Sequence, residues 1–457
     1  MHLTIVGGGW AGLSAAVHAV QRGWTATLWE ASRQLGGRAR PLEQAALQLD
    51  NGQHILIGAY TETLALMRTL GVRPDAVLHR QPLTLLRPDG SGLVLPDLPP
   101  PWNLLVGVWR ARGWNWLDRW SLVRAAVQWQ RQNFRCPDHV TVADLCTPVT
   151  DRVKQQLIEP LCVSALNTSS QAASGAVFLR VLHDALWSVR GGSDLLLPTA
   201  DLGALLPDAA ATWLAQHGVD IRLGSRWQPS SAQADALVLA CPAWEAARLT
   251  ADHHPSWSAQ ANALQHAAIT TVYVQHPDPD FSGLPQPMMA LPSDAQRPAQ
   301  FVFDRGQLLG RSQWGLLAGV VSDSSGTREA LEQQVLVQLQ GQLQAHLQSH
   351  RRVPLQGQRL EQAEEPRLAR LPSDSAHKPP RTAQDCALRV VQTVVEKRAT
   401  FVCTPGLQRP PVAIGPGWWA CGDYVAGPYP ATLEGAVRSG REVIDQIAQT
   451  REGEGRR

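Results

Sequence analysis

Near its start the chain reads Leu3-Thr4-Ile5-Val6-Gly7-Gly8-Gly9-Trp10-Ala11-Gly12, a short apolar run that leads directly into a glycine-rich turn. Residues 13–22 then carry apolar side chains at positions 13, 16, 17 and 20, which is the spacing of one helix face, and Gly23 follows. A second apolar run, residues 25–29, ends at Glu30. This order predicts a strand, a glycine turn, a helix closed by a glycine, and a second strand.

Each glycine of this turn suits a dinucleotide-binding site. Gly7 allows the tight turn, Gly9 lets the backbone approach a pyrophosphate, and Gly12 lets the helix pack closely on the strand. The helix begins around Trp10 and Ala11, where free backbone N–H groups can face the phosphates.

Glu30 lies 18 residues beyond Gly12, where its carboxylate can accept hydrogen bonds from a ribose and so selects against a 2′-phosphate. A lone Gly-x-Gly-x-x-Gly pattern is weak evidence. The strand before it, the helix after it and the acid at the end of the second strand favour a dinucleotide site over a purely structural glycine turn.

The next segment distinguishes between dinucleotides. Gly36, Gly37 and Arg38 follow Glu30, and the Arg38 guanidinium can offer a fixed fork to a phosphate oxygen. The combination resembles the FAD-binding signature of the flavin amine oxidase and phytoene desaturase superfamily, which implies that this turn closes over the FAD pyrophosphate. The alternative is an ordinary Gly-Gly turn after a strand.

A second FAD segment is expected near the other end of the chain. Residues 418–421 read as a buried strand, Gly422 and Asp423 follow, and a last helix opens after Pro430. The strand ending in Gly-Asp resembles the superfamily's contact to the flavin ribityl chain, so Asp423 would accept a hydroxyl hydrogen bond. Backbone N–H groups at the start of the helix would face the pyrimidine O2 of the flavin and stabilise charge on its reduced form. These groups belong to Thr432, Leu433 and Glu434.

The fold class that follows is α/β, with a Rossmann-like FAD-binding domain assembled from discontinuous segments. A second, α+β substrate-binding domain is expected to hold a mixed or antiparallel sheet and helices, because strand-like runs occur at 268–275, 300–305 and 315–322. The FAD-binding domain would comprise residues 1–57, 193–250 and 386–450. The substrate-binding domain would comprise 58–192 and 251–385, and residues 451–457 would form a disordered tail.

Composition excludes several classes of protein. The chain has 457 residues with 41 Lys and Arg against 39 Asp and Glu, so its net charge of +2 gives no reason to expect nucleic acid as a partner. The 7 cysteines are scattered without Cys-x-x-Cys, which favours reduced thiols in a cytoplasmic protein over disulfides or a metal site. No signal peptide and no apolar run of membrane-spanning length is recognisable, so the expected location is cytoplasmic.

Five blocks of the sequence narrow the resemblance further. They are Leu35–Arg40, Leu49–His54, Pro160–Cys162 with Leu166–Thr168, Glu396–Phe401, and Gly422–Asp423 with Tyr429–Ala436. Together they resemble one family, the hydroxysqualene dehydroxylases, which are FAD-dependent, desaturase-like enzymes of bacterial hopanoid pathways. The resemblance runs nearly end to end, and the second and fourth blocks discriminate best, because relatives throughout the superfamily share the glycine motifs.

This resemblance implies that the allylic hydroxyl of hydroxysqualene, a polyisoprenoid, is replaced by hydrogen from reduced FAD to give squalene. Hydroxide is a poor leaving group, so an acid or hydrogen-bond donor should assist it in a dry cavity. His54 or Asp50 could protonate or orient the hydroxyl, with structural hydrogen bonding as the alternative for both. Lys397 resembles the lysine that holds a water at flavin N5 in amine-oxidase relatives. No second dinucleotide motif is present, so the electron donor for FAD is left open.

Tryptophan is unusually frequent, with 17 Trp against 6 Phe and 4 Tyr, and six of them fall within residues 101–130. Trp116, Trp120, Val123 and Val127 share one helical face. That face is either part of the core or an interfacial helix with tryptophan at headgroup depth. In the second case residues 101–130 make a reversible contact with the inner face of the cell membrane.

Three other functions share parts of this pattern. A phytoene or carotenoid desaturase has the same FAD motifs and removes hydride instead of delivering it. A flavin amine oxidase needs aromatic walls around the amine, for which only Tyr424 and Tyr429 lie near a flavin motif. A prenyl-lipid binding protein without redox activity would not need the Gly-Gly-Arg and Gly-Asp motifs, and both are present.

Overall fold

The structure is a computed structural model, and it describes residues 1–42, 47–229, 234–278, 281, 283–347 and 387–454. Within these residues no helix combines the length and the apolar character needed to cross a bilayer. The predicted domain boundary between 385 and 386 lies outside the described residues.

The first of two large sheets joins three distant parts of the sequence. Its six strands lie in the order β10 (Asp220–Arg222), β2 (Thr25–Trp29), β1 (His2–Val6), β11 (Ala236–Leu239), β18 (Trp418–Ala420) and β17 (Ala413–Gly415). All neighbours are parallel except β17 and β18. The predicted strands at both ends of the chain therefore pair through β11, and the α/β class is confirmed.

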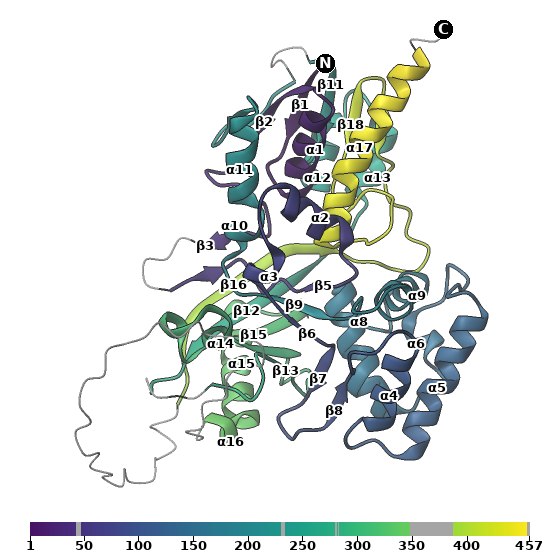
Figure 1. The fold of residues 1–457 in the computed structure, drawn as a ribbon, viewed down its shortest axis with the longest axis vertical. Coiled ribbons are helices and arrows are strands. Elements are labelled where there is room, and N and C mark those ends of the chain that lie inside the picture. Colours follow the sequence, from purple (N-terminus) through teal and green to yellow (C-terminus); the bar gives the residue numbers. More distant parts are fainter. Residues whose placement is uncertain (43–46, 230–233, 279–280, 282, 348–386, 455–457) are drawn as a thin grey trace.

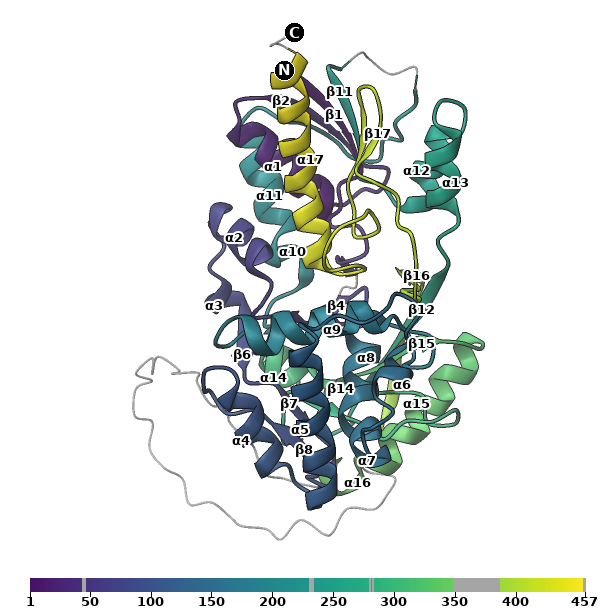
Figure 2. The same cartoon turned by 90° about the vertical axis from the view of Figure 1, so that its right-hand side faces the viewer.

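Helix α1 (Trp10–Gln21) packs beside α17 (Leu433–Glu454), so the first and last helices of the chain cover one face of this sheet together (Figure 1). Helices α12 (Ala243–Thr250) and α13 (Pro255–Asn262) lie on the other side (Figure 2). The expected tail is partly wrong: α17 continues to Glu454, so residues 451–454 are helical, while 455–457 lie outside the described residues.

The second large sheet is antiparallel throughout. Its order is β13 (Met288–Ala290), β14 (Phe301–Asp304), β15 (Leu316–Ser324), β12 (His266–Gln275) and β16 (Arg389–Phe401). Helix α15 (Arg328–Gln342) places Leu331, Val335 and Leu339 in a buried cluster on one face of it. Strand β16 was expected in the FAD-binding domain, and its pairing with β12 assigns it to this sheet instead; the other domain boundaries stay a prediction.

A bulge in β16 decides which of its side chains face inward. The pair Ala267 and Thr400 is followed by the pair Ile269 and Glu396, so β16 places three residues, 397–399, where β12 places one. Extra residues of this kind shift the alternation of side chains and re-aim them. The family block Glu396–Phe401 spans this bulge.

Six further helices form a layer at the end of the molecule away from the termini (Figures 1 and 2). They are α4 (Trp102–Arg110), α5 (Trp116–Arg131), α6 (Val142–Leu145), α7 (Asp151–Val153), α8 (Glu159–Leu166) and α9 (Gly175–His183). Their buried residues share a core with the second sheet, including Trp129, Phe178, Tyr273 and Phe303. Short strands complete the fold: β3 (Pro41–Leu42) with β4 (Leu49–Asp50), β5 (Leu56–Ile57) and β6 (Leu78–Gln81) with β9 (Leu195–Pro198), and β7 (Thr84–Leu86) with β8 (Gly92–Val94).

We expect Gly12→Ala to destabilise the protein and lower its flavin content, because a Cβ at position 12 would lie 1.9 Å from the Gly7 carbonyl oxygen. Separating the helix from the strand to relieve this clash should cost at least about 1–3 kcal/mol. Thermal unfolding and the flavin absorbance of the purified protein measure both effects. Gly341→Ala is the matched control, because nothing lies within 4 Å of the added Cβ. Equal behaviour of the two variants would contradict the close packing at Gly12.

Candidate active site

One cavity of about 610 Å³ lies where the two large sheets meet. The first sheet and its helices contribute the glycine turn, the start of α17 and the Gly-Asp segment. The second sheet contributes inward-facing residues of β12, β14, β15 and β16, and α8 contributes three more. The cavity therefore spans the boundary between the two predicted domains.

The glycine motifs line this cavity as a continuous stretch of backbone. Gly7, Gly9, Trp10 and Ala11 lie along it, and Gly12 packs behind them against the strand. The two motifs touch each other, because the Gly36 N–H donates to the Gly8 carbonyl oxygen at 2.9 Å and Gly9 bridges to Gly36. Gly36 and Gly37 also line the cavity.

Glu30 lies at the end of β2 as predicted and faces the same cavity. Its two carboxylate oxygens accept hydrogen bonds from backbone N–H groups of Gly8 at 2.6 Å and of Ser32 at 2.7 Å. The carboxylate thus holds the glycine turn in shape. Since each oxygen can accept more than one hydrogen bond, a contact to ribose stays a compatible prediction.

Arg38 and Asp423 both line the cavity and form an ion pair there. The Arg38 guanidinium donates to a carboxylate oxygen of Asp423 at 2.6 Å and to the Ala399 carbonyl oxygen at 2.5 Å. Burial acts to lower the pKa of Arg38, but the charge and hydrogen bond of Asp423 outweigh it and the pKa is raised. Sequence reasoning gave each residue its own flavin contact; the structure also joins them in an ion pair that connects the two FAD segments and β16.

The start of α17 lies at the cavity, and the expected contact of its backbone N–H groups to the flavin stays a prediction. Thr432 and Leu433 line the cavity, and the Thr432 hydroxyl accepts the Gly435 N–H at 2.9 Å. The Glu434 side chain is fully buried away from the cavity, where its carboxylate accepts from the Thr63 N–H at 2.9 Å and from Arg438 at 2.7 Å. The Glu434 side chain therefore stabilises the N-terminus of α2 (Thr61–Thr69), whereas the role predicted for Glu434 concerned its backbone N–H group.

The residues present fit FAD. The N-termini of α1 and α17 reach the cavity from the same sheet, which suits phosphate at one helix and an electron-rich ring edge at the other. The Tyr424 hydroxyl and the Thr271 hydroxyl are both buried at the cavity without a hydrogen-bond partner among the described residues. Buried polar groups are normally paired, so these two indicate a polar ligand.

His54 lines the cavity, but it is not a ready acid. Its Nε2 lies 3.3 Å from the Asn51 carbonyl oxygen. Burial lowers the pKa of His54 to about 4, so the ring is neutral at pH 7. A neutral imidazole can orient a hydroxyl through a hydrogen bond, and that part of the prediction stands as a proposal.

Asp50 is not brought into the cavity, which corrects the expectation that it handles the substrate hydroxyl. Its carboxylate forms an ion pair with Arg305 at 2.7 Å, with both side chains at most 2% exposed, and accepts the Leu202 N–H at 3.0 Å. Arg305 also donates to Gln53 at 3.0 Å. These contacts fix the segment that carries Asn51 and His54, so Asp50 is a positioning residue.

Lys397 does not lie where its predicted role at flavin N5 requires. It lies in the β16 bulge with its side chain exposed, whereas its neighbour Glu396 lines the cavity. Glu396 accepts a hydrogen bond from the Asn51 side-chain amide at 3.1 Å. Asn51, Thr271 and Glu396 were missed as site residues, and the only signal for two of them was membership of the discriminating family blocks.

Apolar side chains make up part of the wall on this side. Ile269, Phe301, Phe303, Val320 and Val394 line it from the second sheet. Asn51, His54, Thr271 and Glu396 lie in the same lining, which also includes the polar residues Gln53, Ser164, Asn167, His266, Ser322 and Thr400. No group of three or more side chains suited to a metal ion occurs among the described residues.

The comparisons with known proteins agree with this geometry. Residues 10–448 match the model of flavin containing amine oxidoreductases, so the chain belongs to that family and is an FAD-dependent oxidoreductase. The chain is also similar to the hydroxysqualene dehydroxylase of Rhodopseudomonas palustris, with 23% identity over 97% of each chain, and to that of Zymomonas mobilis, with 23% identity over 96% of this chain and 97% of the other. The resemblance recognised from the sequence is confirmed.

Solved structures support the fold. An oxidoreductase from Methanosarcina mazei superposes with a TM-score of 0.65 at 15% identity, covering 97% of this chain and 100% of the other. Cyclohexylamine oxidase from Brevibacterium oxydans superposes with a TM-score of 0.64 at 15% identity, covering 99% of each chain.

We expect Asp50→Leu to lower the free energy of unfolding by about 3–5 kcal/mol, because it leaves the Arg305 charge buried and unpaired. The double variant Asp50→Leu with Arg305→Met removes both charges and should recover part of this loss. Denaturant unfolding of the two variants and the wild type checks the difference. If the double variant were the least stable of the three, the ion pair would not be the reason for burying Asp50.

We expect His54 to make the protein less stable as the pH falls from about 7 to 5. In this window the unfolded chain protonates a histidine of ordinary pKa 6.5, whereas native His54, with its pKa of about 4, stays neutral. The unfolded state therefore binds more protons, and stability falls by at most about 2 kcal/mol from this group. His54→Gln should lose less stability than the wild type over the same range in denaturant unfolding. Identical losses would show that His54 titrates normally.

Proposed function

We propose that the protein replaces the allylic hydroxyl of hydroxysqualene by hydrogen and so forms squalene, as its similarity to hydroxysqualene dehydroxylases suggests. The observation that carries this proposal is that Asn51, His54, Thr271 and Glu396 line the cavity beside apolar side chains of the second sheet and close to the flavin motifs. A long hydrocarbon with one hydroxyl needs such a surface, since each buried polar group requires a partner. The product would serve isoprenoid and hopanoid biosynthesis.

The reaction has a simple balance. The C–O bond breaks and the hydroxyl leaves as water after gaining one proton, while the allylic carbon gains a hydride. Reduced FAD supplies that hydride and its two electrons when bound. A reductant outside this chain must then return two electrons, and its identity does not follow from the residues of the site.

Glu396 is the residue best placed to assist departure of the hydroxyl. Its carboxyl group lies in the cavity wall and is held by the Asn51 amide at 3.1 Å. In this proposal the Glu396 carboxyl group passes a proton to the leaving oxygen, and its carboxylate stabilises positive charge on the allylic system. The Thr271 hydroxyl and the neutral His54 ring orient the substrate oxygen.

The apolar residues exclude water from the developing cation. Phe301, Phe303 and Val320 face the cavity from neighbouring strands, so a carbocation there meets side chains that cannot add to it. These apolar side chains match a neutral isoprenoid, which is why we favour it over an amine.

The decisive experiment is anaerobic incubation of the photoreduced enzyme with hydroxysqualene. We expect flavin reoxidation together with one squalene per flavin. Reoxidation without squalene would overturn the proposed reaction, and a product with additional double bonds formed by oxidised enzyme would assign the protein to the desaturases.

We expect Glu396→Gln to reduce kcat by about 10²–10⁴, the range for loss of a general acid, while flavin content stays unchanged. Glutamine keeps the size of the side chain and can still accept the Asn51 hydrogen bond. Lys397→Gln is the matched control, because it alters the adjacent, exposed residue of the same bulge. Single-turnover reoxidation of the reduced flavin measures both. A larger effect at Lys397 than at Glu396 would restore the original assignment of the lysine.

A further inference from the structure

The outer side of α4 and α5 exposes an unusual amount of apolar surface. Seven of the twelve exposed large apolar residues among those described fall between positions 102 and 127. The four tryptophans in that set all lie here, with exposures of 60% for Trp102, 65% for Trp109, 65% for Trp116 and 56% for Trp120. An exposed cluster of large apolar side chains on a protein surface usually marks a binding site.

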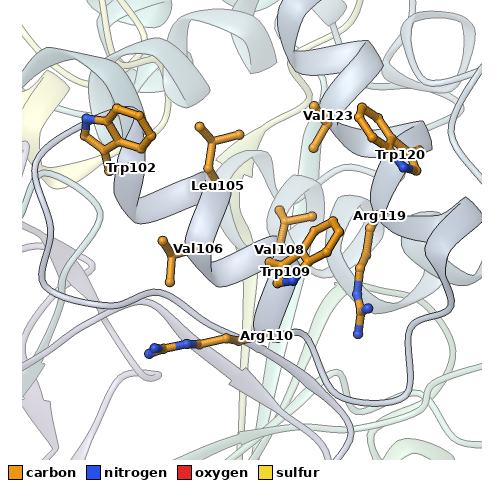
Figure 3. Close-up of a pocket in the computed structure, with 9 residues that line it drawn as sticks. All are labelled: Trp102, Leu105, Val106, Val108, Trp109, Arg110, Arg119, Trp120 and Val123. Atoms are coloured by element: carbon orange, nitrogen blue, oxygen red, sulfur yellow. The ribbon is translucent and has the colours of Figure 1, made fainter.

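Four of these seven residues, Trp102, Leu105, Trp109 and Trp120, line a groove of about 500 Å³ between the two helices (Figure 3). Its walls are Trp102, Leu105, Val106, Val108, Trp109, Trp120 and Val123, with Arg110 and Arg119 at its edge. The Arg119 guanidinium lies 5.8 Å from the ring centroid of Trp109.

The helices themselves are firmly anchored, so the exposure is not a sign of loose packing. Leu104 and Val108 of α4 and Leu122 and Trp129 of α5 are buried in the core shared with the second sheet. A capping box between Asn115 and Asp118 fixes the start of α5. Both helices therefore carry apolar residues on two faces, and the described chain covers only the inner one.

The sequence alone left two interpretations of the face with Trp116, Trp120, Val123 and Val127. The structure excludes the core interpretation for most of it, since Trp116, Trp120 and Val127 are exposed and Val123 is half-buried. Trp114 and Trp129, by contrast, belong to the core.

The charge of this region is strongly one-sided. Residues 101–131 hold five arginines and one acid, so the local net charge is 5 − 1 = +4, whereas the whole chain has +2. The single acid, Asp118, is buried and accepts from the Asn115 N–H and the Thr150 hydroxyl. The five arginines are Arg110, Arg112, Arg119, Arg124 and Arg131.

We propose that the outer face of α4 and α5 docks on the surface of an anionic phospholipid bilayer. Indole rings prefer the boundary between headgroups and acyl chains, and arginine reaches the phosphates while its stem lies on apolar surface. The combination of exposed tryptophans with net positive charge is the pattern of an interfacial, non-spanning contact. A substrate that resides in the bilayer would be collected there, but the docking argument does not require the proposed reaction.

A second copy of the chain fits this face less well. A two-fold interface would set the same +4 surface against itself, and like charges at such an interface disfavour association. The face also lies at the end of the molecule away from both termini, where the helical layer is outermost (Figures 1 and 2).

The test is co-sedimentation of the full-length, FAD-loaded protein with vesicles of phosphatidylcholine mixed with phosphatidylglycerol, and with vesicles of phosphatidylcholine alone. We expect binding to the mixed vesicles, weaker binding to the neutral ones, and release at high salt. Trp109→Ala with Trp116→Ala should weaken binding to the mixed vesicles at least tenfold, and Arg110→Gln with Arg124→Gln should abolish the preference for anionic lipid.

Val337→Ala is the control, because Val337 is 60% exposed on α15, outside this face. Flavin content and single-turnover reoxidation with detergent-dispersed substrate should be unchanged in all variants, which separates failure of docking from failure of the proposed reaction. Undiminished vesicle binding by the tryptophan variant would overturn the proposal. A second outcome would also overturn it: the wild type binds neither type of vesicle and forms dimers in sedimentation velocity, whereas the tryptophan variant is a monomer.

Discussion

The contacts of Arg38 connect the parts of the molecule that sequence order keeps apart. Its guanidinium binds Asp423 from the C-terminal FAD segment and the Ala399 carbonyl from the β16 bulge, while its own backbone continues the Gly-Gly turn that touches Gly8. An arginine suits this position because its donors point in fixed directions and its charge persists when buried. The Asn51 amide adds a second polar connection, because it donates both to the Arg38 carbonyl oxygen and to Glu396 of β16.

The bulge in β16 turns this connection into a chemical site. Three residues opposite one break the alternation of the strand, so Glu396 faces the cavity and Lys397 faces solvent, while the Ala399 carbonyl is presented to Arg38. The Asn51 amide donates a hydrogen bond to Glu396 and so connects it to the segment that carries His54. The buried ion pair of Asp50 with Arg305 fixes the same segment on the side away from the cavity. One irregularity in a strand thus decides which ionisable residue can approach a substrate.

Sequence reasoning succeeded where local patterns determine structure. The strands and helices around Gly7–Gly12 and Gly422–Asp423 follow from short apolar runs and glycine spacing, and their meeting in one sheet follows from the two halves of one cofactor signature. It failed where side-chain direction depends on distant contacts. Asp50 and Lys397 are chemically suitable acids or bases, but a partner at position 305 and a bulge against β12 turn them away from the cavity. The direction of a side chain beside a bulge is not encoded in the spacing of its neighbours.

The two apolar surfaces of this protein are built differently, and the difference supports separate roles. In the cavity, apolar side chains lie beside polar groups, and Asn51, His54 and Glu396 have hydrogen bonds within the protein that fix their positions, which suits recognition of a hydroxyl. On α4 and α5, exposed apolar side chains lie among exposed arginines whose guanidinium groups remain in water. This combination suits the surface of a phospholipid bilayer, which offers both acyl chains and phosphates. The cavity therefore has the properties needed for selectivity, and the helical face has those needed for reversible attachment. A neutral overall charge is compatible with both, because the positive charge needed for attachment is confined to one short segment.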